Sequence, residues 1–88
     1  MNKDVSMPEI ARFYGIVIKL YFGDHPPPHF HAVYGECVGL MSIDNLQMVE
    51  GDLPPRALRL VVEWASLNQA ELLRMWERQE FYRLPGLD

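Results

Sequence analysis

The sequence predicts a small α+β domain, in which one long C-terminal helix packs on one face of a four-stranded, largely antiparallel meander sheet. Apolar residues recur at every second position in the first half of the chain, which is typical of strands buried on one side. In the last third they recur at every third or fourth position, as in an amphipathic helix. The 88 residues fit one domain, which we place at 7–80, between a flexible tail at 1–6 and a short, frayed C-terminal tail at 81–88.

The first patterned segment, 14–22, predicts a strand. Successive side chains of a strand point to opposite faces, so one face receives Tyr14, Ile16, Ile18, Leu20 and Phe22. The strand ends at 23–28, where three consecutive prolines have a fixed φ and no N–H and therefore cannot pair within a sheet.

Two further strands are expected on either side of Gly35–Glu36. Glycine reaches a positive φ without strain, so this dipeptide predicts a hairpin with a type II′ turn. The hairpin would form three pairs: Tyr34 with Cys37, Ala32 with Gly39, and Phe30 with Met41. A second turn at Asp44–Asn45 leads to a short fourth strand at 46–49.

A helix is expected from about Pro54 to Gln79, because proline is tolerated in the first helical turn. Its solvated stripe consists of Arg56, Arg59, Glu63, Ser66, Ala70 and Arg74, and its buried stripe of Leu58, Val61, Ala65, Leu72 and Trp76. We expect the helix to cover the more apolar sheet face, which carries Ile16, Ile18, Phe30, Met41 and Ile43.

The opposite face of the sheet is predicted to remain open. It would expose five candidate interface residues, Val17, Tyr21, Val33, Val38 and Leu40. Apolar surface of this extent is usually covered, and Cys37 is the only cysteine, so the chain has no internal disulfide to supplement its small core. We therefore expect a homo-oligomer or a complex with a small protein partner.

Charge and composition limit the function classes. The formal net charge of −4 and the pI near 5.2 argue against direct binding to nucleic acid, which favours a basic surface. The sequence has no apolar run of about 20 residues that could span a membrane. With no apolar signal segment in 1–6 and a single thiol, we expect a cytoplasmic protein.

All three histidines lie in the segment Asp24–His31. Positions i and i+2 of a strand share a face, so His29 and His31 would project side by side from the open face. With His25 and Asp24 they form a candidate site for a divalent metal ion, with Asp44 as another possible ligand. Two alternatives stay open: histidines that only pack, and a histidine that acts as a general base without metal.

The same face carries a weak acid/base constellation. Its candidate catalytic residues are His29, His31, Lys19 and Asp44, with Ser42 as the only hydroxyl near them. Cys37 is expected to point toward the helix as an inert thiol. An enzyme is therefore the second hypothesis: a histidine-dependent or metal-assisted hydrolase, such as a ribonuclease-like toxin.

Three groups of residues resemble a known family: Met7–Ile10 with Arg12–Gly15, Asp24–Ala32 with Tyr34–Gly35, and Leu53–Pro54 with Arg56–Leu58 and Glu63–Ala65. Together they resemble the small bacterial domain-of-unknown-function family 4160 (DUF4160), from Met7 to about Trp76. The resemblance implies a short protein often encoded beside another small protein, as in a toxin–antitoxin or regulatory gene pair. It supplies no established catalytic residue. The leading hypothesis is a protein-interaction or self-association module.

Overall fold

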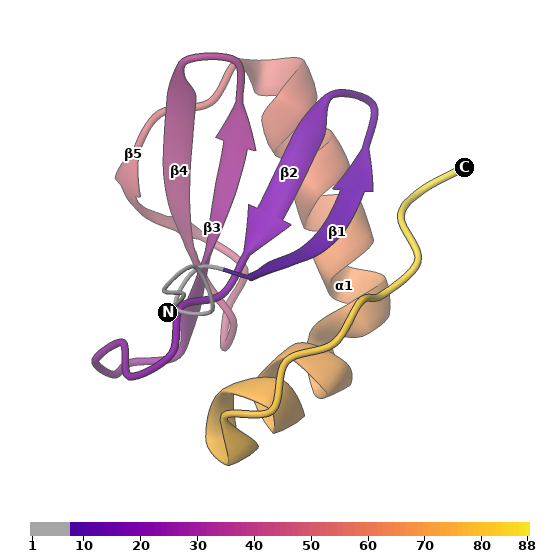
Figure 1. The fold of residues 1–88 in the computed structure, drawn as a ribbon. Helices are drawn as coiled ribbons and strands as arrows, with labels where there is room; N and C mark the ends of the chain where they lie inside the picture. Colours follow the sequence, from indigo (N-terminus) through magenta and orange to yellow (C-terminus); the bar gives the residue numbers. More distant parts are fainter. Residues whose placement is uncertain (1–7) are drawn as a thin grey trace, which may run out of the picture.

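Five strands precede a single helix along the chain (Figure 1). The computed structural model describes residues 8–88, so the tail expected at 1–6 lies outside the described residues. The elements are β1 (Glu9–Phe13), β2 (Ile16–Lys19), β3 (His29–Tyr34), β4 (Cys37–Ser42), β5 (Met48–Gly51) and α1 (Pro55–Arg78). The strands form one sheet in the order β1-β2-β3-β4-β5, with each neighbouring pair antiparallel. The predicted α+β class is confirmed, but the sheet has five strands rather than four.

The missed strand is β1, which a two-residue turn joins to β2. Tyr14 and Gly15 form this turn with φ angles of 50° and 82°, a type I′ geometry in which tyrosine is uncommon. A bulge between Glu9 and Ala11 buries Ile10 and Ala11 together, which breaks the alternation expected of a strand. The predicted strand at 14–22 was therefore too long, and Tyr14 and Phe22 are exposed rather than buried.

The hairpin predicted around Gly35–Glu36 is confirmed. β3 and β4 pair in the expected register, and Gly35 has a φ of 60°. The last strand, β5, begins two residues later than expected. Leu46 adopts a φ of 58° and donates its N–H to the Ser42 carbonyl, so it belongs to the turn and not to the strand.

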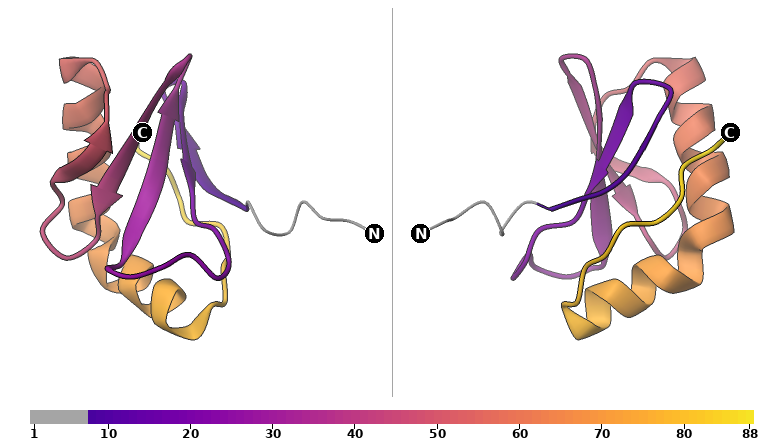
Figure 2. Two further views of the ribbon diagram at one scale, coloured as in Figure 1. Left: turned by 90° about the vertical axis from the view of Figure 1, so that its left-hand side faces the viewer. Right: turned by 45° about the vertical axis from the view of Figure 1, so that its right-hand side comes forward.

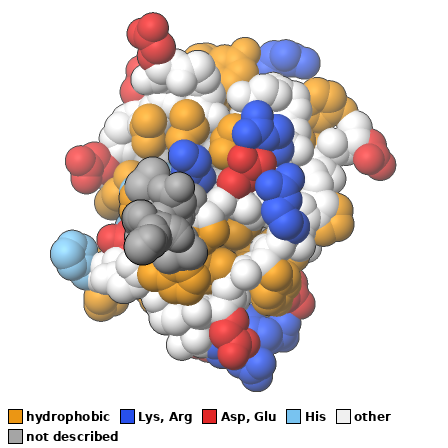
Figure 3. Space-filling model, in the orientation of Figure 1, with side chains coloured by type: hydrophobic (Ala, Val, Ile, Leu, Met, Phe, Trp, Pro, Cys, Tyr) orange, Lys and Arg blue, Asp and Glu red, His pale blue; other side chains and the backbone are white. Residues whose placement is uncertain are grey.

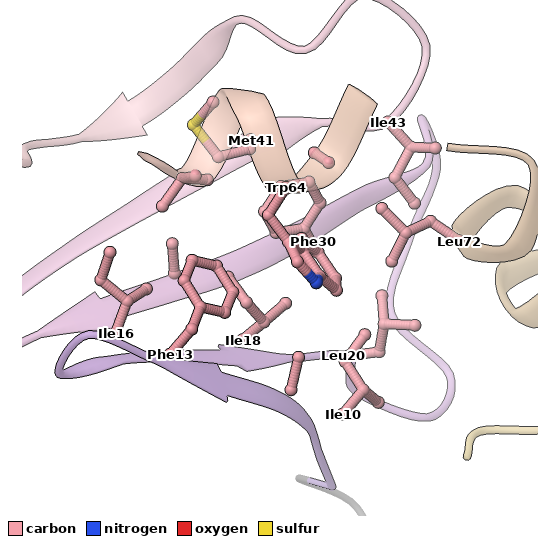
Figure 4. Close-up of a cluster of buried hydrophobic side chains, with 14 of the residues drawn as sticks. Ile10, Phe13, Ile16, Ile18, Leu20, Phe30, Met41, Ile43, Trp64 and Leu72 are labelled. Atoms are coloured by element: carbon pink, nitrogen blue, oxygen red, sulfur yellow. The ribbon is translucent and has the colours of Figure 1, made fainter. Parts of the chain in front are cut away.

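The helix covers the predicted face of the sheet, as the edge-on view of Figure 2 shows. All five residues expected beneath it are fully buried. Trp64 lies at the centre of this core, where its ring stacks on Phe13 at 5.6 Å and meets Phe30 edge-on at 6.2 Å (Figure 4). Within residues 8–88, no helix combines the length and the apolar character needed to cross a membrane.

α1 bends at Asn68, whose backbone leaves the helical conformation with φ −123° and ψ 15°. The Asn68 amide donates to the Trp64 carbonyl at 2.8 Å, the position that a backbone N–H occupies in a regular helix. Gln69 then donates to the carbonyls of Ile43 and Asp44. The second half of α1 consequently passes along the end of the sheet where β2 leads into the proline loop (Figure 1).

The C-terminal segment 81–88, which we expected to be a frayed tail, packs against the sheet in the structure. It runs beside β1, where Leu84 donates its N–H to the Ile10 carbonyl at 2.7 Å, and the Trp64 indole donates to the Pro85 carbonyl at 2.8 Å (Figure 2). Phe81, Leu84 and Leu87 pack against the core. The segment thus satisfies backbone groups that an edge strand would otherwise expose.

An ion-pair network fastens this segment to the sheet. The Glu9 carboxylate accepts hydrogen bonds from the Arg12 guanidinium at 2.7 Å and from the Arg83 guanidinium at 2.8 Å. The bond from Arg12 is the main reason that the pKa of Glu9 falls from 4.5 to about 2, although burial opposes this change. Because the folded-state pKa lies below the unfolded-state value, ionised Glu9 stabilises the fold above about pH 4.5.

We predict that Glu9→Gln lowers the free energy of unfolding by about 1 kcal/mol at pH 7, a modest amount because water screens surface ion pairs. The difference from the wild type should disappear as the pH falls from 4.5 toward 2, where Glu9 becomes protonated. Urea unfolding across this pH range measures it, with Glu36→Gln in the exposed β3–β4 turn as the control. A difference that stays constant down to pH 2 would contradict the assignment.

Candidate functional site

The face that α1 leaves uncovered, here called the open face, carries two rows of paired side chains. On β2 to β5, the first row runs from Val17 through Val33 to Val38, and the second runs from Lys19 through His31 and Leu40 to Glu50. On β1, Arg12 extends the first row and Glu9 extends the second. All five predicted interface residues belong to this face. In Figure 3, which views the molecule from this side, hydrophobic side chains are interspersed with side chains of both charges.

A cluster of Asp24, His29 and His31, here called the His–Asp cluster, forms at one end of the open face. One potential ligand atom of each residue lies within 4.8 Å of the other two. Asp24 Oδ2 is 2.9 Å from His29 Nε2 and 3.4 Å from His31 Nε2. The three side chains are only 20%, 11% and 15% exposed, so the cluster is largely shielded from water.

The second nitrogen of His29 determines what the cluster requires. His29 Nδ1 lies 2.9 Å from the Pro27 carbonyl oxygen, which can only accept, so Nδ1 carries a proton. In a neutral ring Nε2 then presents a lone pair to the Asp24 carboxylate. Two lone pairs at this separation repel one another unless a cation lies between them. The geometry therefore calls for a positive charge here, either a second proton on His29 or a metal ion.

Packing fixes both rings, and burial shifts the titration of His31. The Tyr21 ring stacks on His31 at 4.3 Å, and Trp76 lies 5.2 Å from His29. Burial lowers the pKa of His31, which outweighs the opposing effect of Asp24. Burial also tends to raise the pKa of Asp24, but the hydrogen bond from His31 and the charge of His29 keep that pKa below its usual value. The anionic carboxylate of Asp24 therefore lies beside the neutral imidazole of His31.

The loop that carries Asp24 is anchored to the end of α1. Gln79, the left-handed residue that ends the helix, accepts a hydrogen bond from the Gly23 N–H at 2.8 Å. Phe22 stacks on Phe81 at 4.3 Å, immediately beyond the helix. The other carboxylate oxygen of Asp24 accepts the backbone N–H of His25, so one oxygen orients the side chain while Oδ2 faces the histidines.

A small hollow of about 150 Å³ adjoins the cluster. It is lined by His25, Pro26, Pro27, Pro28, His29, Leu40, Ser42 and Val49. Its walls are mainly apolar, and His29 belongs to both the hollow and the cluster. A small molecule or a partner side chain in the hollow would therefore contact the ring of a cluster histidine.

The structure separates the candidate residues into two groups. Lys19 pairs with His31 across the sheet, so it stays beside the cluster. His25 is exposed and Asp44 lies in the β4–β5 turn, so both lie outside the cluster. Ser42 pairs with His29, but its hydroxyl accepts the N–H of Asn45. The described residues therefore contain no activated hydroxyl at the cluster, and Cys37 is half-buried against the core.

Sequence reasoning missed the residues that support the site. Trp76 was assigned to the buried helix stripe, with no indication that it reaches His29. Gln79 binds a residue 56 positions earlier in the chain, and no spacing rule connects the two. The Pro27 carbonyl that accepts from His29 is a backbone group, so the pattern of side chains in the sequence could not predict it.

Fold and site together define a class: a small α+β domain in which one helix backs a five-stranded meander and a two-histidine, one-carboxylate cluster lies on the open face. A sequence model described as "Domain of unknown function (DUF4160)" matches residues 15–77. The chain belongs to the DUF4160 family. The match includes the whole His–Asp cluster but neither β1 nor the segment 81–88. Comparison with curated proteins and with solved structures finds no match.

We predict that Gln79→Ala loosens the loop that carries Asp24, because the Gly23 N–H loses its acceptor at the helix end. Loss of about 1 kcal/mol should speed hydrogen exchange of the Gly23, Asp24 and His25 amides about fivefold. NMR-detected exchange measures this effect. Glu77→Ala, at an exposed position of the same helical turn, should leave these amides unchanged. Equal rates in the two variants would show that Gln79 does not hold the loop.

Proposed function

We propose that this protein is a protein-interaction module that self-associates through the open face of its sheet. The observation that carries the proposal is the apolar row Val17–Val33–Val38, which no described helix or strand covers. Val38 is 44% exposed, and Val17 and Val33 are half-buried. Patches of this kind on a small domain commonly mark interaction sites, because their burial contributes roughly 25 cal/mol per Å².

A second copy of the chain is the occupant that the charges favour. On the β1 side, Lys19, Arg12 and Arg83 lie around the single carboxylate of Glu9 and leave a net positive charge, whereas the second row ends with the anion Glu50 on β5. A twofold axis parallel to β3 between two facing sheets would place the Lys19 end of each copy over the Glu50 end of the other. The same axis would stack the two apolar rows, as a self-complementary interface requires.

The second protein of a toxin–antitoxin-like or regulatory gene pair is the alternative occupant of this face. The family resemblance supports such a partner, and the single cysteine fits a reducing cytoplasm. Direct contact with nucleic acid is disfavoured by the net charge of −4.

We predict that Val38→Glu abolishes self-association, because it would bury an unpaired carboxylate within the apolar row of the interface. Light scattering during size exclusion should give about twice 10.2 kDa for the wild type and 10.2 kDa for the variant. Leu67→Glu is the matched control, since Leu67 is 72% exposed on α1, away from the open face. A wild type that stays monomeric at about 0.1 mM would exclude the second copy. Binding of the neighbouring gene product would then identify the alternative occupant.

A histidine-dependent or metal-assisted hydrolase is the second candidate function. The shielded His–Asp cluster and the adjoining hollow favour it. Because no activated hydroxyl lies at the cluster among the described residues, the nucleophile would have to be water, activated by a histidine or a metal ion. The acidic balance of the chain disfavours RNA as the substrate.

If the chain is a hydrolase, His31→Ala should reduce hydrolysis of p-nitrophenyl phosphodiesters and acetates at least 100-fold, the usual contribution of a catalytic acid or base. Glu36→Gln should retain the wild-type rate, because Glu36 lies in the exposed β3–β4 turn, outside both the cluster and the hollow. Release of p-nitrophenol with and without added Zn²⁺ measures both rates. No activity above buffer in any wild-type sample would exclude hydrolysis of these ester classes.

A further inference from the structure

We infer that Asp24, His29 and His31 bind a divalent first-row transition-metal ion of the zinc class, in a three-ligand site with at least one coordination position left open. Although His31 lies in the second row of the open face, the inference requires no second copy of the chain and stands independently of self-association. It depends on the spacing of the ligand atoms, on their lone pairs, on their outer partners and on the chemical nature of the donor set.

The spacing of the ligand atoms fits one ion. Zinc–nitrogen and zinc–oxygen bonds of about 2.0–2.1 Å place two ligand atoms about 3.4 Å apart around a tetrahedral ion and about 3.0 Å apart around an octahedral one. Asp24 Oδ2 lies 2.9 Å from His29 Nε2 and 3.4 Å from His31 Nε2. Both distances from the carboxylate match one ion, and the two histidine ligand atoms lie within 4.8 Å of each other, so an ion that coordinates all three atoms would draw the imidazoles together.

The lone pairs also favour a cation. His29 Nδ1 donates to the Pro27 carbonyl, which leaves the Nε2 lone pair for a ligand bond. Asp24 Oδ2 faces both histidines, and no other donor among residues 8–88 binds it, since the His25 N–H binds Oδ1. The neutral ring of His31 can donate its own Nε2–H to Oδ2, but the contact with His29 brings two lone pairs together, and a metal ion between the three atoms would satisfy both contacts.

The outer partners resemble those of metal-binding histidines in general. Such histidines usually donate their second ring nitrogen to a carbonyl or a carboxylate, which fixes the tautomer and the ring orientation. Pro27 has this role for His29, and it belongs to a run of three prolines whose φ angles are fixed. The stacked Tyr21 ring holds His31 in place. The ligands are thus oriented before the ion arrives.

The donor set selects the class of metal. Two imidazoles and one carboxylate suit zinc, cobalt, nickel or iron, whereas magnesium and calcium prefer oxygen donors alone. Cys37 lies on the helix side of the sheet, so no thiolate joins the site. Three protein ligands with an open position are typical of zinc sites that bind water or a substrate, while structural sites use four. The hollow beside His29 offers space for such a ligand.

The test is calorimetric titration of Zn²⁺ into the full chain, after purification without a tag and removal of metal by a chelator. The wild type should bind one equivalent. Asp24→Asn, His29→Gln and His31→Gln should each weaken binding by at least about 100-fold, the upper end of what loss of an outer partner costs. His25→Gln, which alters an exposed histidine one residue beyond Asp24, should bind within about threefold of the wild type, a difference smaller than any loss of an outer partner.

Three controls distinguish loss of the metal site from loss of folding and from loss of self-association. Thermal unfolding in EDTA shows whether each variant folds, and the nearly isosteric Asp24→Asn provides a variant with minimal change in packing. Co²⁺ should give a visible d–d spectrum with the wild type and His25→Gln but not with His31→Gln. Val38→Glu should retain zinc binding, which separates failure of this site from failure of self-association. Absence of zinc binding by the wild type, or equal losses in His25→Gln and His31→Gln, would overturn the assignment.

Discussion

The packing of Trp64 is the interaction on which the rest of the structure depends. One side chain joins the helix to β1 through Phe13, to β3 through Phe30, and to the C-terminal segment through the Pro85 carbonyl. A domain of 88 residues has few such junctions, because its core is small relative to its surface. The same contacts hold the helix on one face of the sheet. The opposite face, which carries the histidines, is therefore left uncovered by α1.

The bend at Asn68 divides this helix into a first half that packs on the sheet and a second half that contacts the residues around the His–Asp cluster. Before the bend, α1 presents Ala57, Val61 and Trp64 to the sheet, and after it Trp76 and Gln79 reach the residues around the His–Asp cluster. A straight helix would continue past the end of the sheet. One side-chain hydrogen bond, from Asn68 to the Trp64 carbonyl, accompanies the change of direction. Core packing and site geometry therefore share one element.

The sequence contained most of the fold and about half of the site. Alternation and helical spacing are local signals, and they predicted the β3–β4 register, the span of α1 and its exposed stripe. β1 was missed because a bulge and a tyrosine in a left-handed turn both violate the usual rules. The His29–His31 pair followed from strand geometry, whereas the choice of Asp24 over His25 and Asp44 depended on tertiary contacts. Support from Gln79 and Trp76 could not be predicted, because no local pattern links residues so distant in the chain.

The hydrogen bond between Gly23 and Gln79 at the end of α1 also has a consequence for folding and dynamics. Every strand pairs with its neighbour along the chain, so the sheet has low contact order and can form early. The anchor between Gly23 and Gln79 spans 56 residues and forms only when the last turns of α1 dock. Fraying of those turns would release the loop with Asp24 while the sheet and Trp64 stay in place. Any ligand that needs an ordered cluster would stabilise the helix end by mass action, which couples occupancy of the site to the order of the last turns of α1.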